Sequence, residues 1–156
     1  MSDYASYIAD KLVRVQPTGF DPPLLHDGLF PHQQALTSWA LRRGRCAVFA
    51  DTGLGKTRIQ LEWAAKVHEH TGMDVLILAP LAVAMQTADE GRELGVDVTV
   101  CREQADVKKG VNITNYERLH RFTPSRFGAV VLDESSCIKH HDTKTLKMLL
   151  DRKSVV

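Results

Sequence analysis

The sequence predicts an α/β fold in which a parallel sheet is covered by helices on both faces. The first observation is a series of short apolar runs of strand length, at residues 75–79, 96–101, 111–114 and 129–132. The second is that segments with helical periodicity separate them, at residues 81–94 and 116–121. Strands that alternate with helices at this spacing imply right-handed crossovers and a parallel sheet.

A third observation is a further strand-like run, Cys46-Ala47-Val48-Phe49-Ala50, which precedes a glycine-bearing loop. Residues 59–67 after the loop have helical periodicity. The order of strand, glycine loop and helix is typical of α/β proteins that bind a ligand at the sheet edge.

The remaining elements are less regular. Residues 3–14 could form a short helix, and residues 16–28 contain enough proline and glycine to form an irregular connector. Pro31 begins an amphipathic helix that ends near Gly44, and residues 143–150 form a last helix. We therefore expect a lead-in over residues 1–28, followed by one domain over residues 29–156.

Composition sets broad limits. A chain of 156 residues with 44% apolar and 25% charged residues is typical of one soluble globular domain. The formal charge of +1 gives no whole-chain argument for nucleic acid. No apolar stretch approaches ~20 residues, so no membrane span is expected, and the first residues do not resemble a signal peptide. Cys46, Cys101 and Cys137 are far apart, which favours reduced, mostly buried thiols in a cytoplasm.

The loop after residue 50 matches a phosphate-binding pattern. Its expected ligand-binding residues are Asp51, Thr52, Gly53, Leu54, Gly55, Lys56 and Thr57. Backbone N–H groups of such a loop converge on a β-phosphate, lysine reaches the β- and γ-phosphates, and the threonine hydroxyl ligates Mg²⁺. Ala50 stands where the usual pattern has its first glycine, but this position closes the strand and does not touch phosphate. ATP and Mg²⁺ are therefore the expected cofactors.

A second motif ends the apolar run 127–132. Asp133 and Glu134 follow it directly, and residues at the carboxyl end of a buried parallel strand face the ligand crevice. Asp133 would hold Mg²⁺ through water, and Glu134 would orient and deprotonate the attacking water. By itself the pair could be a strand that ends in solvated acids. Together with Lys56, it favours nucleotide hydrolysis.

The order of these motifs resembles the amino-terminal RecA-like domain of superfamily-two helicases and translocases, a P-loop NTPase fold. The resemblance runs from about residue 20 to residue 144 and is closest to the Swi/Snf-type branch and its phage-encoded relatives. Leu29-Phe30-Pro31-His32-Gln33, with Trp39 after it, is similar to that branch's adenine-recognition segment. The resemblance implies that Gln33 reads the adenine edge and that Phe20 stacks on the ring.

Two further segments resemble the family's strand-tracking motifs, Leu78-Ala79-Pro80-Leu81 with Gln86, and Ile113-Thr114-Asn115-Tyr116-Glu117. A proline-containing turn and an asparagine helix cap explain the same residues structurally, and both can be true alongside phosphate binding. After the Asp-Glu pair, Ser136 stands where the family often has His or Asp, and Lys139 matches a family lysine. The nucleic-acid contacts implied by the resemblance are Pro80, Leu81, Gln86, Asn115, Tyr116 and Lys139. His140 and His141 lack a spaced third ligand, so a metal site there is not expected.

The resemblance also implies a partner. Family motors need a second RecA-like domain, which supplies arginines to the γ-phosphate site and half of the nucleic-acid track. The sequence stops before the family's third motif, whose strand lies between the phosphate-loop strand and the Asp-Glu strand, so we expect a sheet that is incomplete at its C-terminus.

Two hypotheses remain open. In the first, the chain is the ATP-binding half of a DNA helicase or translocase in a bacterial or phage-infected cell, with duplex DNA as the favoured substrate. In the second, it is a stand-alone nucleotide-binding regulatory module without turnover. A small phosphate-loop kinase is disfavoured by Gln33, by the segment 115–117 and by the Asp-Glu pair.

Overall fold

A computed structural model of the chain describes residues 16–133. The helices expected at residues 3–14 and 143–150 lie outside this range. The described elements, in chain order, are α2 (Pro31–Arg43), α3 (Lys56–Thr71), β1 (Asp74–Leu78), α4 (Leu81–Glu93), β2 (Val98–Val100), η1 (Gln104–Asp106), β3 (Val111–Thr114), η2 (Tyr116–Arg121), η3 (Pro124–Arg126) and β4 (Phe127–Leu132).

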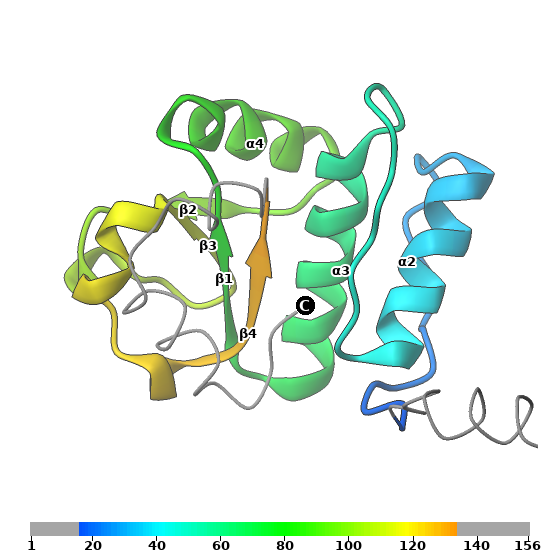
Figure 1. The fold of residues 1–156 in the computed structure, drawn as a ribbon, viewed down its shortest axis with the longest axis horizontal. Helices are drawn as coiled ribbons and strands as arrows, with labels where there is room; N and C mark the ends of the chain where they lie inside the picture. Colours follow the sequence, from blue (N-terminus) through cyan, green and yellow to red (C-terminus); the bar gives the residue numbers. More distant parts are fainter. Residues whose placement is uncertain (1–15, 134–156) are drawn as a thin grey trace, which may run out of the picture.

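The strands form one parallel sheet in the order β2-β3-β1-β4 (Figure 1). Leu78, the last residue of β1, is in register with Thr114 at the end of β3 and with Leu132 at the end of β4. The predicted α/β class, the four strands between residues 75 and 132 and the helices over residues 31–44 and 81–94 are confirmed. The carboxyl ends of the three longer strands therefore lie level along one edge.

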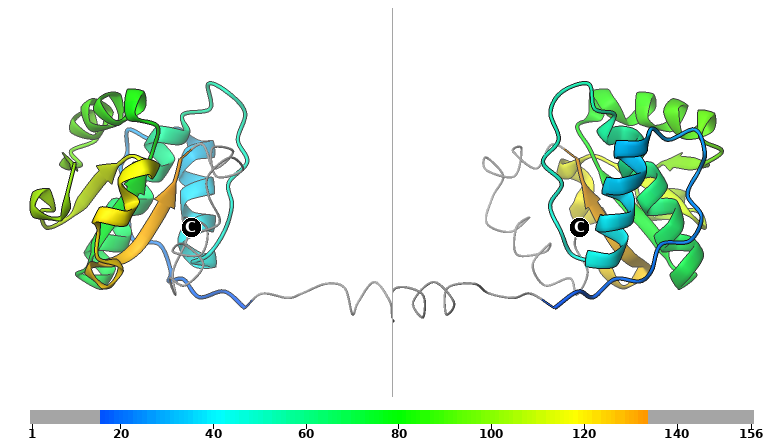
Figure 2. Two further views of the ribbon diagram at one scale, coloured as in Figure 1. Left: turned by 60° about the vertical axis from the view of Figure 1, so that its left-hand side comes forward. Right: turned by 90° about the vertical axis from the view of Figure 1, so that its right-hand side faces the viewer.

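Alternate residues of the strands face two separate apolar clusters. Val75 and Ile77 belong to the larger cluster, which α3 and α4 cover, whereas Leu76 and Leu78 belong to the smaller one on the opposite face. The helix α2 packs on the outer side of α3 (Figure 2). Because β1 is buried on both faces, it reads as a continuous apolar run in the sequence.

The second face of the sheet is covered differently from the first. In the described range, η2 and the rings of Phe122 and Phe127 pack there, and no α-helix does. The helix expected at residues 116–121 is present, but as a 3₁₀-helix. The segment between β3 and β4 is short, and its tighter turns bring Tyr116 and Leu119 directly onto the sheet.

The expected strand at residues 46–50 is wrong. The segment is extended, and its side chains alternate between partly buried and exposed, but it pairs with no described strand. Cys46 and Val48 pack against the larger cluster, while Phe49 is 94% exposed. A strand needs a hydrogen-bonded neighbour, and among the described strands β4 at this side of the sheet pairs with β1 alone.

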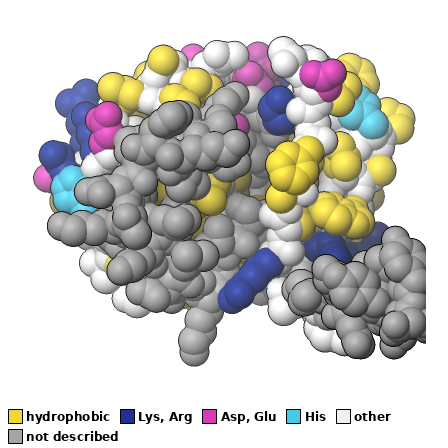
Figure 3. All heavy atoms as spheres, viewed as in Figure 1, with side chains coloured by type: hydrophobic (Ala, Val, Ile, Leu, Met, Phe, Trp, Pro, Cys, Tyr) yellow, Lys and Arg dark blue, Asp and Glu magenta, His cyan; other side chains and the backbone are white. Residues whose placement is uncertain are grey.

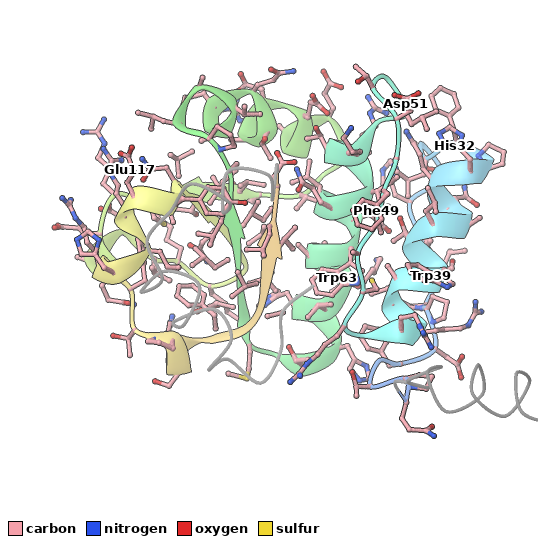
Figure 4. All side chains as sticks on the ribbon, in the orientation of Figure 1. His32, Trp39, Phe49, Asp51, Trp63 and Glu117 are labelled. Atoms are coloured by element: carbon pink, nitrogen blue, oxygen red, sulfur yellow. The ribbon has the colours of Figure 1, made fainter. Side chains whose placement is uncertain are left out.

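Several large apolar side chains are exposed on α2 and on the segment that follows it. Figure 4 labels Trp39 on α2 and Phe49 on the segment that follows α2, and Figure 3 shows apolar side chains on this part of the surface. The exposed large apolar residues here are Phe30, Trp39, Phe49 and Leu54. An exposed apolar area of this kind is typical of a surface that contacts another protein segment.

Of the two thiols that the structure describes, Cys101 is buried, as expected, and Cys46 is half-buried. Cys46 and Cys101 are both free. Burial raises the pKa of the Cys101 thiol to about 11, with a contribution from Asp106 that Lys108 opposes. Burial also raises the pKa of Cys46. Cys137 lies outside the described residues. Neither described thiol is activated as a nucleophile. No helix in the range 16–133 is long and apolar enough to cross a membrane.

One acidic side chain holds the amino edge of the sheet together. Asp74 is 5% exposed; its Oδ1 accepts a hydrogen bond from the Gly110 N–H at 3.0 Å, and its Oδ2 lies 2.7 Å from Nε of Arg126. These contacts join the start of β1 to the segments before β3 and β4. Hydrogen bonds to charged groups contribute more than neutral ones, so Asp74 stabilises the junction of these three segments.

We expect Asp74→Ala to lower the free energy of unfolding by about 2 kcal/mol, because two polar groups lose a charged partner. Chemical denaturation measures this loss. Asp97→Ala is the control, since Asp97 is exposed and surface substitutions usually stay within about 0.5 kcal/mol. Equal effects of the two substitutions would contradict this role of Asp74.

Candidate functional site

The glycine-bearing loop lies at the carboxyl edge of the sheet. The helix α3 begins at Lys56, directly after the loop, and runs back along the sheet toward the amino ends of the strands. Figure 1 shows the loop at the same end of the molecule as the arrowheads of β1 and β4. The fold therefore brings the start of α3 and the strand ends together, as ligand crevices of parallel α/β sheets require.

Two glycines give the loop its shape. Gly53 and Gly55 have φ angles of 84° and 72°, a region that other residues rarely adopt. The Leu54 N–H donates to the Asp51 carbonyl at 3.4 Å, and the Thr52 N–H donates to Oδ1 of Asp51 at 2.7 Å. The loop is thus a tight turn that delivers the chain directly into the first turn of α3.

The first turn of α2 holds this loop in place. Gln33 is 2% exposed; its Oε1 accepts from the Phe30 N–H at 3.0 Å, and its Nε2 donates to the Leu54 carbonyl at 3.2 Å. Nε2 of His32 lies 3.2 Å from the same carbonyl. Figure 4 shows His32 at the end of α2 nearest to the loop that carries Asp51. Gln33 is therefore a structural link to the loop, and its contact with adenine stays a prediction.

The close contact of Gln33 with the loop is a second reason why residue 55 is glycine. A Cβ atom at Gly55 would lie 2.2 Å from Nε2 of Gln33, whereas a Cβ at Gly53 would meet nothing within 4 Å. Both positions have a positive φ, but only at Gly55 would a Cβ atom also clash with a neighbouring side chain. The glutamine and the second glycine of the loop therefore form one packed unit.

The charges at the start of α3 favour an anion. Lys56 is the first residue of the helix, and its Nζ donates to the Ala50 carbonyl at 3.0 Å, so the side chain folds back across the loop. Thr57 follows in the first turn, which carries no acidic residue. Free N–H groups and the positive end of the helix dipole attract a phosphate at this position.

Asp133 directly follows β4 at the same edge. Its N–H donates to the Leu78 carbonyl at 2.8 Å, and its own carbonyl accepts from the Tyr116 hydroxyl at 2.5 Å. The described residues contain no cluster of three or more His, Cys, Asp or Glu side chains that could hold a metal. The Thr57 hydroxyl and the Asp133 carboxylate are hard oxygen donors, which fit Mg²⁺, an ion held by few protein ligands together with phosphates. Glu134 lies outside the described residues.

The predicted nucleic-acid residues do not all lie at one place. Pro80 precedes the first turn of α4, and Asn115 and Tyr116 follow β3, so all three lie at the carboxyl edge. Leu81 begins α4 and is 59% exposed. Gln86 lies further along α4, where its Nε2 donates to Oε1 of Glu90 at 3.3 Å, so it is not brought to the strand ends. Lys139 lies outside the described residues, as do Ser136, His140 and His141.

The expected stacking of Phe20 on adenine is wrong in this arrangement. Phe20 stacks on His70, with ring centroids 3.8 Å apart and an interplanar angle of 5°. His70 lies near the C-terminal end of α3, about 21 Å along the helix from Lys56 at a rise of about 1.5 Å per residue. The Phe20 N–H also donates to the Leu41 carbonyl at 3.0 Å, which holds the ring at this distant end.

Sequence analysis missed two polar contacts at the edge. One is the contact of His32 with the loop carbonyl, although its position beside Gln33 was a usable signal. The other is the hydrogen bond from the Tyr116 hydroxyl to Asp133, which joins residues 17 positions apart. No local sequence pattern signals that bond, because it depends on the register of β3, β1 and β4.

A surface hollow of about 460 Å³ lies elsewhere, against the C-terminal half of α3 and the start of β3. Glu62, Lys66 and Lys109 are among the residues that line it. Opposite charges alternate around it, and Lys66 lies 3.0 Å from Oε2 of Glu69. We place the candidate site at the loop instead, because within residues 16–133 only this edge combines the N-terminus of a long helix, a lysine and a carboxylate after a strand.

Comparison with known proteins gives a structural match. No protein-family model matches the sequence, and no curated protein matches it. Among solved structures, the UvsW helicase from bacteriophage T4 matches with a TM-score of 0.65 and 15% identity, covering 92% of this chain and 54% of that one. A second structure of T4 UvsW matches with a TM-score of 0.62 and 16% identity, covering 84% of this chain and 29% of that one. The chain therefore shares the RecA-like α/β fold found in part of these structures, and it spans about half of one of those chains and less than a third of the other.

We expect Gly55→Ala to destabilise the loop more than Gly53→Ala. Both substitutions carry the cost of a positive φ, about 1 kcal/mol, but only Gly55→Ala drives a methyl group against Gln33. Denaturation and hydrogen exchange over residues 50–58 measure the difference. Adding Gln33→Ala to Gly55→Ala should recover part of the loss. Equal effects at the two glycines would contradict the packed unit of Gln33 and Gly55.

Proposed function

We propose that this chain is the ATP-binding part of an ATP-dependent DNA helicase or translocase, which couples ATP hydrolysis to movement when it acts with a second RecA-like domain. The domain would extend over residues 29–156, with residues 1–28 as a lead-in. The observation that carries the proposal is the Gly-Lys-Thr loop at the start of α3, on the same sheet edge as Asp133. The fold of the T4 helicase supports it.

The loop would bind the triphosphate. Backbone N–H groups around residues 53–57 would surround the β-phosphate, and Lys56 would exchange its bond to the Ala50 carbonyl for the β- and γ-phosphate oxygens. The remaining loop residues, Asp51, Thr52 and Leu54, shape the turn. The positive end of α3 adds to the attraction.

Hydrolysis would depend on residues that follow β4. Thr57 and Asp133 would hold Mg²⁺, which neutralises phosphate charge as the bond to the leaving group breaks. Glu134 would orient the attacking water and accept its proton. By the resemblance, arginines of the second domain would compensate the charge that develops on the γ-phosphate.

Base recognition would fall to Gln33. Its amide can accept from the exocyclic amine of adenine and donate to the neighbouring ring nitrogen. Because both ends of the amide already have protein partners, reading adenine would require it to exchange its bond to the Leu54 carbonyl. Adenine binding would then change the contact that holds the loop.

The nucleic-acid backbone would cross the carboxyl edge next to this site. Pro80, Leu81, Asn115 and Tyr116 lie at helix starts beside the strand ends, where N–H groups and short polar side chains bind phosphates without reading sequence. Gln86 and Lys139 complete the set implied by the Swi/Snf-type resemblance, and duplex DNA is the favoured substrate. The protein would act in the cytoplasm of a bacterial or phage-infected cell.

We expect Lys56→Ala to abolish measurable ATP binding, because it removes the main positive charge from the phosphates. Titration of a fluorescent ATP analogue with Mg²⁺ present measures this. Lys109→Ala is the matched control, since Lys109 is an exposed lysine near the opposite edge of the sheet and should leave the affinity unchanged. Equal affinities of the wild type and Lys56→Ala would contradict the phosphate-loop assignment.

The alternative is a stand-alone regulatory module that binds ATP without turnover. Phosphate release by the longest native polypeptide that contains this chain, with and without duplex DNA, separates the two. Turnover that DNA stimulates and that Glu134→Gln removes supports the motor. Binding through Lys56 with no turnover under either condition supports the module. If the motor hypothesis holds, the 156-residue chain alone should turn over barely or not at all, since an arginine finger from the second domain accounts for about 10³- to 10⁵-fold in rate.

A further inference from the structure

A buried carboxylate lines the hollow of about 460 Å³ against the C-terminal half of α3. Glu62 is 2% exposed and belongs to a stripe on α3 whose other members are Ala65, Lys66 and Glu69. These positions, at i, i+3, i+4 and i+7, share one face of a helix, and all four residues line the hollow. The C-terminal half of α3 therefore presents one largely polar face to the hollow.

The carboxylate of Glu62 is only partly paired within residues 16–133. Its Oε1 accepts from the His26 N–H at 2.9 Å, and Nζ of Lys66 lies 4.0 Å from the same oxygen, beyond hydrogen-bond distance. Lys66 is closer to Glu69, with Nζ 3.0 Å from Oε2 and 3.3 Å from Oε1. Oε2 of Glu62 accepts no hydrogen bond from the described residues. Because a buried charge is costly unless it is paired and hydrogen-bonded, a further cation beside Glu62 would be favoured.

Apolar residues from two other segments complete the lining. The lead-in contributes Leu24 and Leu25, and the turn between α4 and β2 contributes Leu94 and Val96. A volume of about 460 Å³ lies in the range of small-molecule sites, which combine apolar walls with a few placed polar groups. The hollow therefore fits a small ligand with an apolar stem and a polar head.

The charges around the hollow select the head group. Glu62, Glu69 and Asp97 line it against two lysines, Lys66 and Lys109, and Lys66 already bonds to Glu69. A cation is therefore favoured over an anion. Among the residues that the structure describes, no cluster of three His, Cys, Asp or Glu side chains could hold a metal ion. An ammonium group suits the one oxygen that has no partner, whereas the planar guanidinium group binds best to two.

We propose that this hollow is a second binding site, which takes a small aliphatic ammonium group with Glu62 as its counter-ion. A free aliphatic amine and the lysine side chain of a peptide offer the same chemistry, and the test below separates them. The attraction must be local, because the whole chain carries a formal charge of +1. The inference is independent of the proposed function, which uses none of these residues.

The test titrates two probes into the 156-residue chain and follows backbone amide resonances by NMR. Putrescine represents a free amine, and N-acetyl-lysine methylamide represents a lysine side chain. Butane-1,4-diol, which has the carbon chain of putrescine without its charges, is the ligand control. Glu62→Gln removes the charge and keeps an oxygen that can accept from the His26 N–H. Glu103→Gln is the matched protein control, because Glu103 is exposed and does not line the hollow.

We expect at least one probe to shift the resonances of residues 24–26, 94–97 and 109–111, and the diol to leave them unmoved. The probe that binds more tightly identifies the source of the ammonium group. Glu62→Gln should weaken binding about tenfold or more, because it removes a hydrogen bond between charged groups. Glu103→Gln should leave the affinity unchanged.

A second variant tests the space instead of the charge. Ala65→Leu keeps the carboxylate of Glu62 and places a larger side chain at the hollow, so it should also weaken binding, and it decides the question if Glu62→Gln does not fold. The inference would be overturned by the absence of shifts with both probes, by equal shifts with the diol, or by an affinity that Glu62→Gln, or in its place Ala65→Leu, leaves unchanged. None of these results bears on nucleotide binding, which the Lys56→Ala titration tests.

Discussion

The parallel register of β1, β3 and β4 is the constraint on which the candidate site depends. Because Leu78 is level with Thr114 and Leu132, the residues that follow all three strands emerge at one edge. The helix α3 packs against β1 and β4 and starts at that edge, so its N-terminus and the loop before it meet the strand ends. A shift of one residue in β4 would exchange its buried faces and move Asp133 away from the Leu78 carbonyl.

The edge is organised by backbone groups more than by charged side chains. Gln33 and the bonds within the loop hold the phosphate loop, while Tyr116 and the Leu78 carbonyl hold the end of β4. Lys56 spans the loop. A site that is shaped before the ligand arrives loses less conformational freedom on binding, which is the property expected of a phosphate-binding loop.

The sequence predicted the elements whose own residues determine them. The sequence predicted β1 correctly because both faces of the strand are buried and its residues form a continuous apolar run. It predicted α2 because the helix starts at a proline. The strand predicted at residues 46–50 is absent, because strand pairing depends on a neighbouring strand and not on the segment itself. Phe20 was assigned to adenine, but it packs on His70, fifty positions away, which no local pattern could indicate. For the same reason the hydroxyl bond of Tyr116 to Asp133 was visible only in the structure. Glu134 and Lys139 remain sequence predictions.

The measurement that tests the account most directly is hydrogen exchange of the chain with and without Mg–ATP, resolved to short peptides. If the nucleotide lies at the carboxyl edge, Mg–ATP should slow exchange over residues 50–58 and at the end of β4, and should leave residues 107–111 at the amino edge unchanged. Protection confined to the amino edge, or no protection over residues 50–58 at concentrations that saturate binding, would contradict the placement of the site.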